Sequence, residues 1–288
     1  MSILFDYSFV TVAIGACLLA FCGALVGSLS VLSNQSLIGD TLAHASYPGV
    51  IFAYMLTQDR APIILMCGAI FSGYVSYYLV HYLTDKLNHS YTNALTIISS
   101  SFFGLGMVLN QFLQGNAHFS KAAQAGLKNY LFGQAAFIQE DDIWLIVIVS
   151  FITIAIFIRY YESFCLYLSD KTFAKLQGVN VSLMKHLSTF MVVLLISVGL
   201  KVVGAILMSS FLVAPAVTGM LPSKHFKQSL VIASITAVVS AFIGTYASST
   251  VKGLSTGPAI IIVMSFIALV TFVYHTRREK GGGTWKSQ

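Results

Sequence analysis

Long apolar runs recur along the whole chain and restrict the folds that it can adopt. A bilayer core about 30 Å thick needs roughly 20 apolar residues per helix, and helices satisfy their own backbone groups in lipid. Charged residues make up only 9% of the 288 residues and hydrophobic residues 57%, whereas soluble domains carry about 25% charged residues. We therefore predict an all-α integral membrane protein, a polytopic helical bundle that forms a single transmembrane domain over residues 1–288.

The apolar runs predict nine membrane spans. An odd number of spans places the two termini on opposite sides of the membrane. If the two short spans on either side of Gly204 form one helix instead, the count falls to eight. The predicted spans cover residues 7–32, 41–56, 62–82, 91–113, 142–159, 187–202, 204–221, 228–247 and 257–275.

The basic residues indicate the orientation, because cytoplasmic loops carry an excess of lysine and arginine. A C-terminus in the cytoplasm places eleven of the 16 lysines and arginines inside. We therefore expect a multi-pass protein of the cell membrane with its N-terminus outside and residues 277–288 as a cytoplasmic tail. The basic residues on the inner side are then Lys86, Arg159, Lys171, Lys175, Lys185, Lys224, Lys227, Arg277, Arg278, Lys280 and Lys286.

Two segments between the spans are too long for simple turns. Residues 114–141 include GLKNYLFGQAAFI, which is too short to cross a bilayer and predicts a re-entrant or interfacial helix on the outer side. Residues 160–186 are polar and are expected in the cytoplasm. Within them, Asp170 can cap a short helix over 171–177, and Gly178 can adopt the left-handed conformation that ends helices.

One aspartate and one histidine lie within the second predicted span or at its edge, and ionisable groups at membrane depth cost about 2.5–3.5 kcal/mol each on insertion scales. Asp40 and His44 are four residues apart, so they share one face of a helix. A carboxylate and an imidazole are suitable ligands for a divalent transition metal. One pair is half of a site, and two copies of the chain at a two-fold axis would complete it.

A structural role is the alternative for the same residues. Asp40 can cap the second span, with Ser36 and Thr41 sharing the hydrogen bonds, while His44 is an ordinary interior histidine. Lys201 is expected to extend toward the outer interface. Five other histidines lie at span ends or in loops and are expected at the interfaces; they are His81, His89, His186, His225 and His275. His118 lies in the outer loop, where it can contact an incoming ion, although an ordinary loop position is the favoured interpretation.

Charge and cysteine patterns exclude several classes of function. The formal net charge is +6, but the basic residues are dispersed between apolar segments and do not form the stripe typical of nucleic-acid-binding proteins. The four cysteines lack metal-binding spacing and are expected to be packing residues. The chain has no phosphate-binding G-x4-G-K-S/T motif and no HExxH motif, so we do not expect it to be an enzyme.

Five segments resemble one known family. SLIGDTLAHASYPGV at 36–50 resembles the S-L-x-G-D-x-x-A/S-H-A/S-x-x-P-G-V segment of the zinc- and manganese-type ABC importer permeases. The other matches follow in family order and cover nearly the whole chain. They are NYLFGQ at 129–134, SDKTFAKLQGVNV at 169–181, VGAILMSSFLVAPAVTG at 203–219 and STGPAIIIV at 255–263.

The resemblance implies an ATP-driven importer of manganese, zinc or iron in a bacterial cytoplasmic membrane, with the fold of the type II (cobalamin- and siderophore-type) permeases. It implies that Asp40 and His44 bind the transported metal and that no cofactor is bound permanently. The implied partners are a second permease copy, two cytoplasmic ABC ATPase subunits and an extracytoplasmic metal-binding protein. Residues 169–181 look like the family's coupling loop, and the residues assigned to ATPase coupling are Asp170, Lys171, Phe173, Ala174, Lys175, Leu176, Gln177 and Gly178.

Two alternatives accompany this expectation. A secondary metal transporter or channel would act without an ATPase, although such carriers usually show inverted repeats and mid-span carboxylates. The second permease copy can be identical or a paired relative. The ligand types suit manganese, zinc and iron alike, because selectivity among these metals depends on geometry.

Overall fold

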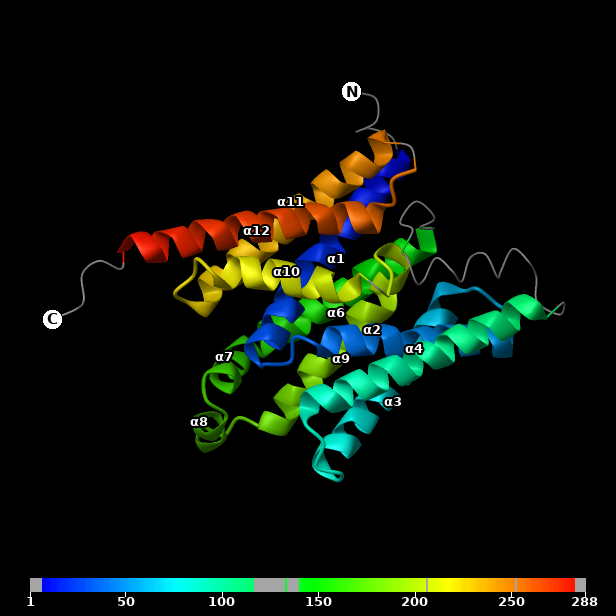
Figure 1. The fold of residues 1–288 in the computed structure, drawn as a ribbon, viewed down its shortest axis with the longest axis horizontal. Helices are drawn as coiled ribbons and strands as arrows, with labels where there is room; N and C mark the ends of the chain where they lie inside the picture. The colour runs from blue at the N-terminus through cyan, green and yellow to red at the C-terminus, as the bar shows by residue number, and fades with distance from the viewer. Residues whose placement is uncertain (1–6, 117–132, 134–139, 206, 252, 283–288) are drawn as a thin grey trace.

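The computed structural model describes residues 7–116, 133, 140–205, 207–251 and 253–282, and every regular element within these residues is a helix (Figure 1). The predicted fold class, an all-α membrane protein, is confirmed. The helices are α1 Tyr7–Leu32, α2 Ile38–Thr57, α3 Pro62–Asp85, α4 Tyr91–Gly115, α6 Glu140–Arg159, α7 Tyr161–Ser169, α8 Lys171–Leu176, α9 Val181–Val202, α10 Met208–Met220, α11 Phe226–Thr250 and α12 Thr256–Gly282.

Within the described residues, seven helices are long and apolar enough to cross a membrane, so the predicted count of eight or nine spans is too high by this criterion. The two predicted spans at 41–56 and 204–221 correspond to α2 and α10. α2 has 20 residues, but its polar residues lower its hydropathy. α10 has only 13 residues, and a helix of that length rises about 20 Å, which is less than the bilayer core.

The chain breaks between α9 and α10, as the nine-span prediction requires. α9 ends at Val202 and α10 begins at Met208. Gly204 lies between them with φ +91°, a conformation that side chains rarely adopt. The eight-span alternative, in which these residues form one continuous helix, is therefore wrong.

Three segments that are far apart in the sequence meet at this break. A Cβ atom on Gly133 would lie 2.2 Å from the carbonyl carbon of Val203, and one on Gly257 would lie 2.8 Å from the Val203 oxygen. Only residues without a side chain allow such a close approach. Gly133 and Gly257 thus allow two other parts of the chain to pack directly against the backbone of the break between α9 and α10.

Two predicted segments fall partly or largely outside the described residues. The re-entrant or interfacial helix expected within 114–141 lies almost entirely outside them. α12 continues to Gly282, so the first part of the predicted tail at 277–288 is helical, and residues 283–288 lie outside the described ranges.

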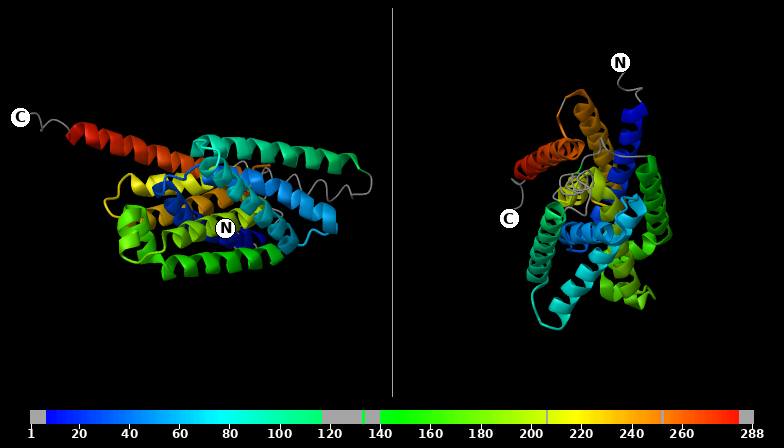
Figure 2. Two further views of the ribbon diagram at one scale, coloured as in Figure 1. Left: turned by 90° about the horizontal axis from the view of Figure 1, so that it is seen from below. Right: turned by 90° about the vertical axis from the view of Figure 1, so that its right-hand side faces the viewer.

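Among the seven candidate spans, α1 and α9 are the most buried, with 61% of the apolar window of each inside the bundle. α2 packs against α3 and α4, and α11 packs against α1 and α12. α4 and α12 lie along one face of the bundle and α6 along the opposite face (Figure 2, left view). α7, α8 and the C-terminal end of α12 lie at one end of the long axis, which we call the α8 end (Figure 1).

Candidate metal site

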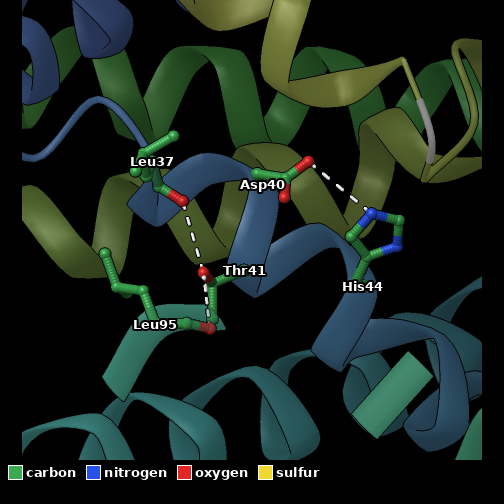
Figure 3. A network of polar contacts seen from close by, with 5 residues as sticks. All are labelled: Leu37, Asp40, Thr41, His44 and Leu95. Carbon is green, nitrogen blue, oxygen red and sulfur yellow. Dashed lines mark hydrogen bonds and ion pairs between the residues drawn. The ribbon is translucent and has the colours of Figure 1, made fainter. Parts of the chain in front are cut away.

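Asp40 and His44 come together on one face of α2, as their spacing predicts. The Nε2 atom of His44 lies 3.6 Å from the Oδ1 atom of Asp40 (Figure 3). Thr41 points away from this pair toward α4, and its hydroxyl donates to the carbonyl oxygens of Leu37 at 3.3 Å and Leu95 at 3.4 Å. The pair and the Thr41 hydroxyl therefore occupy different faces of the first turn and a half of α2.

The capping interpretation of Asp40 is wrong. α2 begins at Ile38, and the N-cap residue is Leu37. Asp40 thus lies inside the first helical turn, where an acidic side chain interacts favourably with the helix dipole. Its side chain faces His44 along the helix axis instead of returning to the N-terminal amides in the manner of an N-cap residue.

The imidazole of His44 is held by its surroundings and is partly open toward Asp40. Its ring packs edge-on against Phe103 of α4, with 4.9 Å between ring centroids. The Nδ1 atom is buried without a hydrogen-bond partner. The side chain of His44 is 18% exposed and that of Asp40 38%, so a small ion can reach the space between Nε2 and the carboxylate.

One chain supplies only part of a metal site. Within the described residues, no group of three or more His, Cys, Asp or Glu side chains gathers in a way that could hold a metal ion. Transition metals in proteins usually have four or more ligands. Asp40 and His44 therefore fit a divalent metal only if ligands from another molecule, or water, complete the coordination.

The short helix that the sequence predicts after Asp170 is present as α8. The Asp170 carboxylate accepts hydrogen bonds from the amides of Thr172 at 2.7 Å and Phe173 at 3.2 Å. These backbone hydrogen bonds lower the pKa of Asp170 from its ordinary value. Gly178 has φ +80°, so both the start and the end of this helix are confirmed.

The residues assigned to coupling divide between the two sides of α8. Ala174 is fully buried against the rest of the chain. Phe173 is 48% exposed and Leu176 81% exposed, although both are apolar. The Lys171 ammonium lies 5.4 Å from the centroid of the Tyr167 ring. The structure thus brings α8 against α7 and leaves two apolar side chains on the outer side of α8.

An ion pair that was not predicted joins α6 to α9. The Lys201 ammonium, in the last turn of α9, lies 2.5 Å from the carboxylate of Asp142 in the first turn of α6. The Asp142 side chain is 8% exposed and the Lys201 side chain 21%. The two residues are 59 positions apart, and no local pattern in the sequence pairs them.

Comparisons with known proteins agree with these observations. Residues 6–275 match the model of the ABC 3 transport family. The chain is 33% identical over 278 residues to the zinc transport system membrane protein TroC of Treponema pallidum, covering 96% of this chain and 92% of that protein. It is 32% identical over 264 residues to the manganese transport system membrane protein MntC of Bacillus subtilis, covering 92% of this chain but only 60% of the length of that relative.

A solved structure has the same fold. The chain is similar to a chain of PsaBC from Streptococcus pneumoniae in complex with Fab, with a TM-score of 0.81 and 25% identity over 93% of this chain and 92% of that one. In the ABC 3 transport family the membrane subunit is the permease, and the ATPase activity lies in a separate component. With the helical fold and a family match over almost its full length, this chain belongs to the ABC 3 transport family, as a multi-pass membrane permease.

Proposed function

We propose that this chain is the permease of an ATP-driven importer that carries a divalent transition metal, manganese, zinc or iron, into the cytoplasm. The observation that carries the proposal is the Asp40 and His44 pair, with its carboxylate and imidazole 3.6 Å apart on one helix face. The imidazole is a borderline ligand that suits zinc and iron, and the carboxylate is a hard ligand that suits manganese. The transported metal is the substrate, and the relatives named for manganese and zinc transport support this class of cargo.

A second copy of the chain would complete the site. Two copies that meet near a two-fold axis would present two carboxylates and two imidazoles, which is a full ligand set for one ion. The partial exposure of Asp40 supports this arrangement, since a ligand needs an open side toward the ion. The proposed assembly is a permease homodimer with two cytoplasmic ABC ATPase subunits and an extracytoplasmic metal-binding protein.

The proposed orientation places the α8 end in the cytoplasm and residues 58–61, between α2 and α3, outside. Arg159, Lys171 and Lys175 lie at or beside α7 and α8, and an excess of basic residues is typical of the cytoplasmic side. In this orientation the exposed Phe173 and Leu176 of α8 face the compartment that contains ATP. We assign residues 170–178 to the ATPase contact, because an apolar helix face buried in a groove anchors such a contact.

A secondary transporter or channel that acts alone is not supported. The chain belongs to an ABC transport family. The exposed apolar side chains of α8 fit a contact with an ATPase partner, which a transporter that acts alone would not have.

Metal uptake by intact cells tests the proposed function. Asp40→Asn and His44→Gln each remove one ligand but preserve shape, so uptake of radioactive manganese or zinc should fall at least about tenfold. Thr41→Val is the matched control, because Thr41 lies on the same turn but points toward α4. The permease is expressed with its ATPase and binding-protein partners at equal level. Uptake at the wild-type rate in both ligand variants would refute the assignment.

A further inference from the structure

A second pair of metal ligands lies near the end of α3, apart from Asp40 and His44, in a cleft that shares Ser33 and Asn34 with a cleft beside α8. His81 and Asp85 are four residues apart near the end of α3, and the His81 Nδ1 atom lies 3.9 Å from the Asp85 Oδ2 atom. The pair repeats the Asp40 and His44 arrangement in reverse order along the helix. We propose that His81 and Asp85 form a weak release site for the transported cation and that Lys185 keeps this site weak.

The pair faces a cleft of about 220 Å³ that is formed by four parts of the chain. The cleft lies between the segment that connects α1 to α2, the end of α3, and the starts of α4 and α9. A space of this size accommodates a hydrated ion. The lining residues are Ser33, Asn34, Gln35, His81, Thr84, Asp85, Tyr91 and Lys185.

The His81 ring is positioned by aromatic neighbours. Its centroid lies 4.5 Å from that of Tyr77 in an edge-on contact and 6.2 Å from that of Tyr91 in a stacked contact. The His81 Nε2 atom and the Tyr91 hydroxyl are buried without hydrogen-bond partners. The ring therefore directs Nδ1, and not Nε2, toward the carboxylate of Asp85, which is 69% exposed to the cleft and the solvent.

Lys185 competes directly for the same lone pair. Its ammonium lies 3.5 Å from the His81 Nδ1 atom. An ammonium group has donors but no acceptor, so Nδ1 accepts this hydrogen bond and offers Lys185 the lone pair that a metal would need. A divalent cation at His81 and Asp85 must displace this positive charge, which weakens its binding.

Weak binding is the property that a release position requires, because conduction depends on binding that lets the ion leave. Within the described residues no third His, Cys, Asp or Glu joins the pair, so water would supply most of the coordination. This inference rests on the proposed function for the identity of the ion. The ligand chemistry and the competing lysine are independent of Asp40 and His44.

Counting bound Mn²⁺ on the purified complex tests the proposal. The permease with its ATPase subunits is placed in lipid nanodiscs, and bound Mn²⁺ is measured by electron paramagnetic resonance at fixed free Mn²⁺. Lys185→Gln should increase the affinity of the second site at least about tenfold and add up to one ion per chain. Lys185→Gln with Asp85→Asn should remove this additional ion. Lys227→Gln is the control for net charge, since Lys227 is exposed at the start of α11.

Each outcome separates this proposal from the proposed function. In an Asp40→Asn background, Lys185→Gln should still add the second ion, although the ion at Asp40 and His44 is lost. If Asp40→Asn alone changes no Mn²⁺ binding, the proposed transport site fails, and the gain of an ion in Lys185→Gln still decides the site at His81 and Asp85. If Lys185→Gln binds no more Mn²⁺ than the wild type, the three residues are only an electrostatic link between α3 and α9, and the release site is refuted.

Discussion

At the scale of single residues, the ion pair between Lys201 and Asp142 has a clear energetic consequence. The Asp142 side chain is almost completely buried at the start of α6. Removal of one member of a buried pair leaves an uncompensated charge, which costs about 3–5 kcal/mol, whereas replacement of both members by apolar residues is often neutral. The pair therefore specifies how α6 meets α9 more than it adds stability.

We predict that Lys201→Met lowers the unfolding free energy by about 3 kcal/mol. The measurement is the thermal unfolding midpoint of the purified protein in detergent. The double variant Lys201→Met with Asp142→Leu should recover most of the loss, since no buried charge is left alone. A single variant as stable as the wild type would show that the pair contributes nothing to the bundle.

The helix α8 is the element that we propose to contact the ATPase. Its first turn is held by Asp170 and its buried side by Ala174, so a change at the exposed Phe173 should leave the helix intact. Because the folded-state pKa of Asp170 is lowered, its capping contribution is present above the unfolded pKa of about 3.9. The contribution is lost only as the pH falls through the folded pKa, so α8 should be insensitive to changes near neutral pH.

We predict that Phe173→Asp reduces ATPase association and metal uptake together, each at least about tenfold, because an anchor residue of an interface contributes about 2 kcal/mol or more. Co-purification of the ATPase gives the first quantity and radioactive metal uptake the second. Phe173→Leu keeps an apolar side chain and serves as the control. Normal assembly and uptake in Phe173→Asp would mean that α8 is not the coupling element.

The crossing of α2 and α3 depends on two glycines. A Cβ atom on Gly49 would lie 2.1 Å from the Gly68 oxygen, and one on Gly68 would lie 2.4 Å from the Gly49 oxygen. Small residues at helix crossings let two backbones approach closely in membrane bundles. This crossing sets the position of α2, which carries Asp40 and His44.

We predict that Gly49→Ala separates the two helices and destabilises the protein by about 1–3 kcal/mol, with reduced metal uptake. Gly115→Ala at the end of α4 is the control, because a Cβ atom there has no neighbour within 4 Å. Thermal unfolding in detergent distinguishes the two variants. Equal midpoints for both would contradict the close crossing.

At the scale of the whole molecule, the orientation in the membrane is testable by cysteine labelling. The native cysteines at 17, 22, 67 and 165 are first replaced. Ser169→Cys at the α8 end should then be protected from an impermeant thiol reagent in intact cells, whereas Arg60→Cys between α2 and α3 should react. Both positions are exposed on the surface of the single chain, and Ser169→Cys should become reactive once the cells are permeabilised and the ATPase is absent. Labelling of Ser169→Cys from outside would reverse the topology.

Much of the fold could be predicted from the sequence because its signals are local. The apolar runs place α1, α3, α4, α6 and α11 to within a few residues. The prediction was less accurate where hydropathy alone was used to infer helix length. α10 is apolar but too short to cross a bilayer, and α9 begins at Val181, six residues before the predicted span. Helix length and amphipathic ends depend on neighbouring elements, which hydropathy does not describe.

By itself, the sequence determined that this protein is a helical membrane bundle, that Asp40 and His44 share a helix face, and that α8 has a cap at Asp170. Each of these follows from residues within a few turns of one another. Only the tertiary structure decided that Lys185 meets His81, 104 positions away, and that Lys201 meets Asp142. Such contacts depend on which helix faces pack together, and that choice is made by the shapes of all the helices at once.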